Sequence, residues 1–392
     1  MSGLSPSTRR ALLIAGIALI ALNLRPAIAS VGPLIGDLRA ATGLSNAAIG
    51  LLSSLPLLGF GLMSALTPVF TRRLGMEGTL ALALGGIAVG AGLRAVPSVA
   101  LLFVGTALFG AAIALGNVLL PALVKRDFPD RSGPMTSLYS SGIGLGAALA
   151  AGASVPLASA VGWRMSLGAW GLLALATLVL WAPLVRGQIL TRPRRSVLAS
   201  LANLGRSPLA WQVALFMGLQ SLTYYVILAW LPDLLQTRGL SPADAGWLLS
   251  INQAMGIVGS LAVPVWAARR ADQRGLIWAL IVLEGLALVG LLVPSLGPAV
   301  IWVSILGAVL GGSFGLSLLL LVLRAATAEG ATELSGMAQS VGYLVAATGP
   351  AIFGWLYDLG GGWTAPLAFL GAVLLGKLAV GLGAGRPGTI GD

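Results

Sequence analysis

An arginine lies near the middle of the first long apolar run of the chain. Arg25 is about 14 residues, or about 21 Å along a helix, into the run 11–35, and Pro26 follows it. A guanidinium stays charged at any ordinary pH, and placing one in a bilayer costs at least about 2.5–3.5 kcal/mol. The side chain is therefore expected to face a cavity or a polar partner within the protein, and both interpretations stay open. Its planar fork suits an anion or polar solute with two acceptor atoms.

Polar and aromatic side chains recur inside later apolar runs, where an amide that faces lipid would be costly. Some of them are spaced four residues apart, so they share one face of a helix. The candidates are the pairs Gln220 with Tyr224 and Gln339 with Tyr343, and the single residues Asn117, Tyr139 and Asn252. Each could contact a bound solute or hydrogen-bond to a neighbouring helix, and the sequence leaves both alternatives open.

The remaining charged residues in or near the apolar runs are candidates for gating, for proton coupling or for structural ion pairs. Glu284 and Lys377 lie at similar depth in two runs, so we expect either a structural ion pair or a Lys377 side chain that extends to the membrane interface, with proton coupling through Glu284 as the alternative. Asp37 lies at the outer end of the first run and could gate or steer. Arg73 and Arg126 lie near the cytoplasmic ends of their runs, where they could form ion pairs between helices that hold one conformation shut or could only set the orientation of the chain.

The composition excludes most soluble functions. Of the 392 residues, 57% are hydrophobic and 9% are charged, whereas soluble domains carry about 25% charged residues. The absence of Cys and His removes the thiolate nucleophile and the most frequent metal ligand. We therefore expect neither an enzyme nor a metal or other cofactor, and no catalytic residues.

Twelve apolar runs are long enough to cross the hydrocarbon core, which needs roughly 20 residues. They are 11–35, 46–70, 77–94, 98–124, 134–160, 164–185, 209–232, 244–267, 275–293, 299–323, 334–357 and 363–384. If the N-terminus is cytoplasmic, seventeen of the 23 Lys and Arg lie inside and four lie outside, namely Arg39, Arg94, Arg164 and Arg238. This bias explains the net charge of +11 without nucleic acid, and it predicts that both termini are cytoplasmic.

The sequence divides into two halves. We expect six helices in 1–185, a basic cytoplasmic linker at 186–208 and six helices in 209–392. Two short patterns recur about half a chain length apart: Pro68-Val69 with Pro264-Val265, and Gly162-Trp163 with Gly362-Trp363. Parallel repeats of six helices are typical of a transporter. The predicted fold class is an all-α membrane protein with twelve transmembrane helices.

Two stretches resemble a known transporter family. The run Leu22-Asn23-Leu24-Arg25-Pro26-Ala27-Ile28 and the run Gly116-Asn117-Val118-Leu119-Leu120-Pro121 are similar to the cyanate/2-nitroimidazole transporter (CynX/NimT-like) subfamily of the major facilitator superfamily. The resemblance implies alternating access and a central cavity lined by the first helix, so Arg25 becomes a candidate substrate anchor. It also implies a multi-pass protein of the cell (inner) membrane, with a small solute and the bilayer as partners. A monomer is expected.

The chain departs from the patterns of drug exporters in this superfamily. Arg72 stands where the loop after the second helix usually has Asp, and the Gly-Pro signature of drug/proton antiporters is absent from the fifth helix. We therefore expect a secondary active or facilitative transporter of a small planar anionic or polar solute. An exporter of neutral or cationic drugs remains the alternative, and proton coupling stays open.

Overall fold

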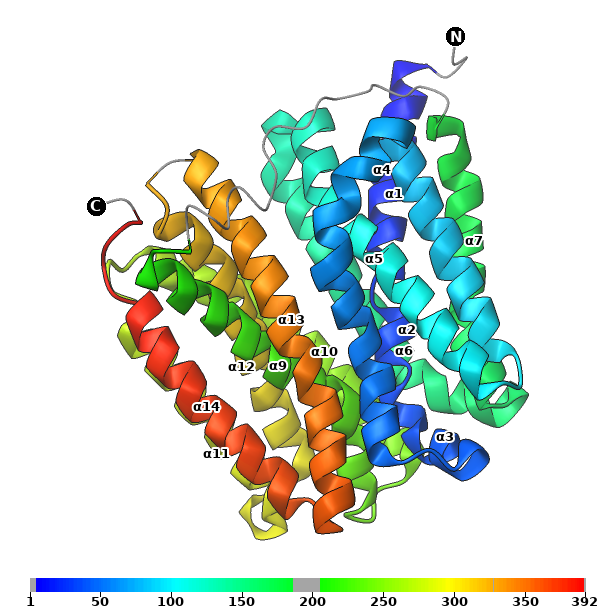
Figure 1. Ribbon diagram of the computed structural model, residues 1–392, viewed down its shortest axis with the longest axis vertical. Coiled ribbons are helices and arrows are strands. Elements are labelled where there is room, and N and C mark those ends of the chain that lie inside the picture. The colour runs from blue at the N-terminus through cyan, green and yellow to red at the C-terminus, as the bar shows by residue number, and fades with distance from the viewer. Residues whose placement is uncertain (1–4, 186–204, 327, 391–392) are drawn as a thin grey trace. The chain divides into compact units, whose positions relative to one another are not determined.

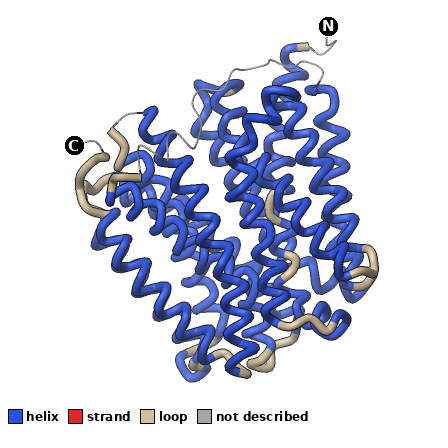
Figure 2. The backbone as a smooth tube through the Cα atoms, viewed as in Figure 1, coloured by secondary structure: helices blue, strands red, loops and turns tan. Residues whose placement is uncertain are grey.

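A computed structural model describes residues 5–185, 205–326 and 328–390. Nearly all of the described backbone is helical (Figure 2). The first group of helices is α1 (Pro6–Asn23), α2 (Pro26–Ala29), η1 (Gly32–Leu34), α3 (Ile35–Thr42), α4 (Asn46–Ala95), α5 (Val99–Asp127), η2 (Pro129–Arg131), α6 (Ser132–Val161) and α7 (Trp163–Val185). The second group is α9 (Pro208–Gln236), α10 (Pro242–Ala268), α11 (Arg274–Leu292), η3 (Pro294–Leu296), α12 (Ala299–Leu323), α13 (Ala328–Gly360) and α14 (Thr364–Ala384).

Several long helices begin at a serine that caps the first turn. The side chain of each serine accepts a hydrogen bond from a backbone N–H three residues on, and so satisfies a donor that has no partner within the helix. The capping residues are Ser5, Ser98, Ser207 and Ser241. Three of these serines precede a proline, whose fixed φ and missing N–H suit the first helical position. The apolar runs thus start at sequence-encoded boundaries.

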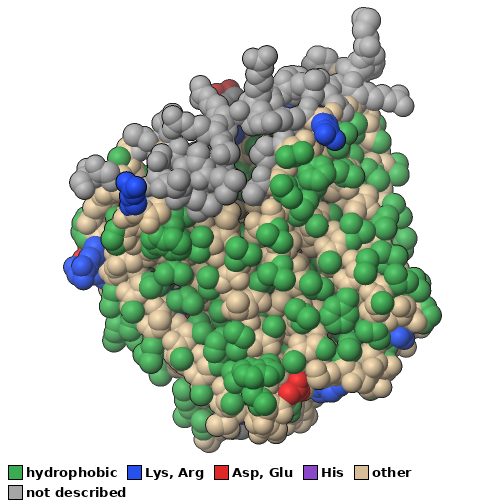
Figure 3. All heavy atoms as spheres, in the orientation of Figure 1, with side chains coloured by type: hydrophobic (Ala, Val, Ile, Leu, Met, Phe, Trp, Pro, Cys, Tyr) green, Lys and Arg blue, Asp and Glu red, His purple; other side chains and the backbone are tan. Residues whose placement is uncertain are grey.

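Eleven helical segments in the described residues are long and apolar enough to cross a membrane. Helix α13, which covers the predicted span 334–357, is the additional long helix. The predicted second and third spans appear as one long helix, α4, which bends at Gly75 (φ 69°, ψ 176°). On the face drawn in Figure 3, apolar side chains predominate, as expected where lipid is the solvent. The fold class predicted from the sequence is confirmed.

The chain forms two compact units, one of residues 1–43 and 55–194 and the other of residues 44–54 and 195–392. The start of α4 therefore packs with the second group of helices, while the rest of α4 packs with the first (Figure 1). The predicted linker at 186–208 lies mostly outside the described residues.

Small residues bring helices into close contact within the second unit. A Cβ added at Gly259 of α10 would lie 1.8 Å from the carbonyl oxygen of Ala308 in α12. At Gly311 of α12 it would lie 1.9 Å from the carbonyl oxygen of Gly256 in α10. These two helices touch backbone to backbone, because no side chain separates them at these positions.

Candidate functional site

The first membrane-spanning segment is broken at Arg25. Its backbone (φ −125°, ψ −28°) separates α1 from α2, because the proline that follows disfavours the helical conformation at the preceding residue. Pro26 also lacks an N–H, so it cannot bond to the carbonyl of Leu22. Helix α6 packs against that carbonyl, where a Cβ added at Gly146 would lie 2.4 Å from the oxygen. The Arg25 side chain is only 9% exposed.

The first unit holds two other predicted site residues. Asn117 lies on α5 and Tyr139 on α6, and both are half-buried. The Nδ2 of Asn117 is buried and has no hydrogen-bond partner among the described residues. Asn117 thus has a donor available to a solute or to water.

In the second unit, a chain of hydrogen bonds connects three polar side chains. The hydroxyl of Tyr224 on α9 donates to Oε1 of Gln253 on α10 at 2.8 Å. Nε2 of Gln253 donates to Oδ1 of Asn252 at 3.2 Å, and Nδ2 of Asn252 donates to the carbonyl of Val303 on α12 at 3.0 Å. The network ties α9, α10 and α12 together. At one end of this chain of hydrogen bonds, Asn252 binds the backbone of α12. At the other end lies the hydroxyl of Tyr224.

The two residues of each predicted helix-face pair, Gln220 with Tyr224 and Gln339 with Tyr343, differ in their environments. Nε2 of Gln220 donates to the carbonyl of Leu310 on α12 at 3.2 Å, so Gln220 and Tyr224 contact different helices. On α13, Nε2 of Gln339 donates to Oγ of Ser335 in its own helix at 3.0 Å, while Tyr343 is 7% exposed. Spacing alone places each pair on one face without fixing its partner.

The ion pair predicted between Glu284 and Lys377 is present. Nζ of Lys377 on α14 lies 2.6 Å from Oε2 of Glu284 on α11, and the side chains are 0% and 1% exposed. A buried pair of this kind joins two helices, because each charge compensates the other and would be costly to bury alone.

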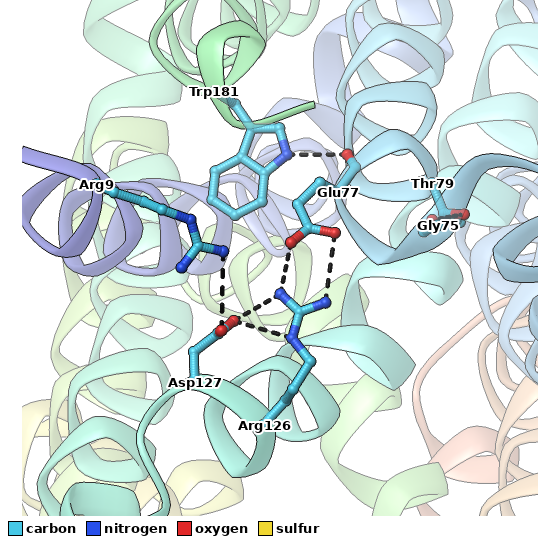
Figure 4. A network of polar contacts seen from close by, with 7 residues as sticks. All are labelled: Arg9, Gly75, Glu77, Thr79, Arg126, Asp127 and Trp181. Atoms are coloured by element: carbon cyan, nitrogen blue, oxygen red, sulfur yellow. Dashed lines mark hydrogen bonds and ion pairs between the residues drawn. The ribbon is translucent and has the colours of Figure 1, made fainter. Parts of the chain in front are cut away.

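A second charged cluster lies at one end of the first unit (Figure 4). Arg126 of α5 holds Glu77 of α4 with both terminal nitrogens, at 2.5 and 3.4 Å, and also contacts Asp127 at 2.6 Å. The indole N–H of Trp181 donates to the backbone carbonyl of Glu77 at 3.0 Å, which ties α7 to the same turn. Of the other gating candidates, Arg73 and Asp37 are exposed.

In the second unit, Arg324 follows the last turn of α12 and is buried. Its guanidinium donates to the carbonyls of Ala384 at 2.8 Å and Gly385 at 3.2 Å, and to Oε1 of Gln273. Burial lowers the pKa of Arg324, and the charge of Asp272 opposes that shift. Arg324 thus joins the end of α12 to the end of α14.

Three important contacts escape the sequence patterns. Glu77 is the carboxylate that holds Arg126, although the sequence points only to the arginine. Arg94, counted among the outer charges, is completely buried in the last turn of α4. Asp358 of α13 accepts from the backbone N–H groups of Asn46 and Ala47 within the second unit. For Glu77 and Asp358 the signal is an acidic residue at the end of an apolar run, yet its partner depends on packing.

Comparison with known proteins identifies the family. Residues 11–350 match the model of the Major Facilitator Superfamily. The 2-nitroimidazole transporter of Escherichia coli (strain K12) is 42% identical over 379 residues, 96% of this chain and 96% of that protein. The cyanate transport protein CynX of the same organism is 28% identical, covering 93% of this chain and 95% of that protein.

A solved structure supports the fold independently. The nucleoside transporter NupG, crystallised as a variant, matches with a TM-score of 0.77 at 15% identity, covering 94% of this chain and 99% of that chain. This likeness concerns the fold alone. Together with the family match and the apolar helices, it shows that the chain belongs to the Major Facilitator Superfamily and is a multi-pass transporter of the inner membrane, in the subfamily that the two sequence stretches predict.

Proposed function

We propose that the chain transports a small planar anion or polar solute, similar to cyanate or a nitroimidazole, by alternating access. The observation that carries the proposal is the buried guanidinium of Arg25 at the break between α1 and α2. The names of the two bacterial relatives support the same class of solute, because one is a 2-nitroimidazole transporter and the other a cyanate transport protein.

Arg25 serves as the anchor for the solute in this proposal. Its charge is permanent, so binding does not depend on a protonation step at this residue. Two parallel N–H donors match two acceptor atoms of a planar solute, and charge-assisted bonds of this type are the strong ones. Asn117 adds a neutral donor from α5, and Tyr139 adds a hydroxyl from α6.

The second unit provides polar groups without net charge. Tyr224 and Gln253 form a hydrogen-bonded pair of polar side chains on α9 and α10, and Gln220, Gln339 and Tyr343 add amide and phenol groups on α9 and α13. We propose that these groups select for solutes rich in acceptor atoms. Glu284 is engaged by Lys377, which favours a structural role for it over proton coupling.

The proposal is tested by thermal-shift measurements on the purified protein against cyanate, 2-nitroimidazole and a panel of bulky cationic drugs. A ligand at about 100 times its Kd stabilises a protein by about 2.7 kcal/mol. We expect cyanate or 2-nitroimidazole to stabilise the wild type and not Arg25→Ala. The matched control is Arg269→Ala, which removes an exposed arginine at the end of α10. Stabilisation by cationic drugs alone, unchanged in Arg25→Ala, would instead favour a drug exporter.

A further inference from the structure

A second buried arginine lies beside the break that contains Arg25. Arg94 is in the last turn of α4 and is 0% exposed. Its Cγ packs so closely on α5 that a Cβ added at Gly105 would lie 3.1 Å away. The centre of its guanidinium lies 4.8 Å from the ring centroid of Phe109, also on α5. The side chain is therefore held in place by packing along its whole length.

The guanidinium of Arg94 contacts the short helix that follows Arg25. Its Nη1 donates to the carbonyl oxygen of Ala27 at 2.7 Å. The backbone N–H groups around the break bond to other carbonyls: Ile28 and Ala29 to that of Arg25, and Ser30 to that of Pro26. The carbonyl of Ala27 thus accepts from side chains: Arg94 supplies the shorter bond, and the hydroxyl of Ser30 donates at 3.5 Å.

Burial of Arg94 is costly, so its hydrogen bond to Ala27 is significant. Its Nε and Nη2 are buried with no hydrogen-bond partner in the part of the chain that the structure describes. A buried charge without a carboxylate destabilises the fold, so such residues in membrane segments tend to have a functional role. Helix α2 has only four residues, too few to be stable without a tether to its neighbours.

We propose that Arg94 is a positioning residue for Arg25. By holding the carbonyl of Ala27, it fixes the turn that starts at Arg25, and with it the backbone from which the anchoring guanidinium extends. This inference rests on the proposed function, because it assigns Arg94 a role only if Arg25 binds the solute.

The test is a double-variant cycle on the affinity for cyanate, measured by calorimetry on the full chain. We expect Arg94→Met to raise Kd about 10-fold, and Arg94→Lys, which keeps a charged donor, to stay within about 3-fold of the wild type. In an Arg25→Lys background, Arg94→Met should change Kd less than about 2-fold, because effects on one shared contact do not add. The control is Trp181→Phe, which removes another bond from a side chain to a carbonyl, and whose effect on Kd should be negligible.

The outcomes separate this inference from the proposed function. Equal effects of Arg94→Met in both backgrounds, or none in either, would overturn the positioning role while leaving Arg25 as the anchor. If Arg25→Lys and Arg25→Ala both bind cyanate as the wild type does, the proposed function itself fails. If Arg94→Met does not fold, Arg94→Gln replaces it, because any change at this residue that weakens binding must show the same non-additivity.

Discussion

The ion pair between Glu284 and Lys377 allows a quantitative test of how charges are tolerated in this fold. The two charged atoms are 2.6 Å apart, and neither side chain is more than 1% exposed. The second carboxylate oxygen of Glu284 has no hydrogen-bond partner among the described residues. Loss of one partner from a buried pair typically costs about 3–5 kcal/mol, because the other charge stays behind without compensation. We expect a destabilisation of this size for Lys377→Met.

Replacing both partners should change the stability little. The double variant Glu284→Leu/Lys377→Met puts apolar side chains of similar size on α11 and α14, and such replacements are often neutral or stabilising. We expect its stability to lie within about 1 kcal/mol of the wild type, since no buried charge remains.

The assay is unfolding of the wild type, both single variants and the double variant in detergent, with solute uptake measured in parallel. A double variant less stable than Lys377→Met would refute the reasoning, because the two losses would then add. Loss of uptake in a stable double variant would show that Glu284 takes part in coupling.

Three further changes probe the contacts that hold helices together. Glu77→Gln weakens the charge-assisted bonds to Arg126 and should lower the free energy of unfolding by about 1.5–3 kcal/mol, measured by thermal unfolding. Wild-type stability would contradict a stabilising role for this contact. Asp358→Ala removes the carboxylate that accepts from the first turn of α4. Amide hydrogen exchange in that turn should become faster, and unchanged exchange would contradict the capping role. Gly259→Ala should destabilise by about 1–3 kcal/mol, because the new methyl group meets the carbonyl of Ala308, and wild-type stability would show that α10 and α12 can separate there.

The sequence predicts those features that depend on one helix at a time. The apolar runs predict the long helices, since each run is long enough to cross the hydrocarbon core. Burial of Arg25 also follows from its position, since a guanidinium cannot remain among lipid chains without a polar environment.

Contacts between helices could not be predicted in the same way, because they depend on rotation and packing. Gln220 and Tyr224 share a face by spacing, yet one reaches α12 and the other α10. Arg94 at the end of an apolar run is typical of a loop residue, yet in the structure it packs on Phe109 and bonds to Ala27 in the interior. The exception is the pair of Glu284 and Lys377, which similar depth in two runs favours and the structure contains.

The most direct test of the central claim is counterflow of labelled cyanate in proteoliposomes containing the wild type, Arg25→Lys or Arg25→Ala. Loss of a charge-assisted bond costs about 1.5–3 kcal/mol, and about 1.4 kcal/mol corresponds to a tenfold change in affinity. We expect the wild type to accumulate cyanate, Arg25→Lys to need at least about 10-fold more cyanate for half-maximal counterflow, and Arg25→Ala to be inactive. Equal counterflow by all three proteins would contradict the account, because the solute would then cross without the anchor.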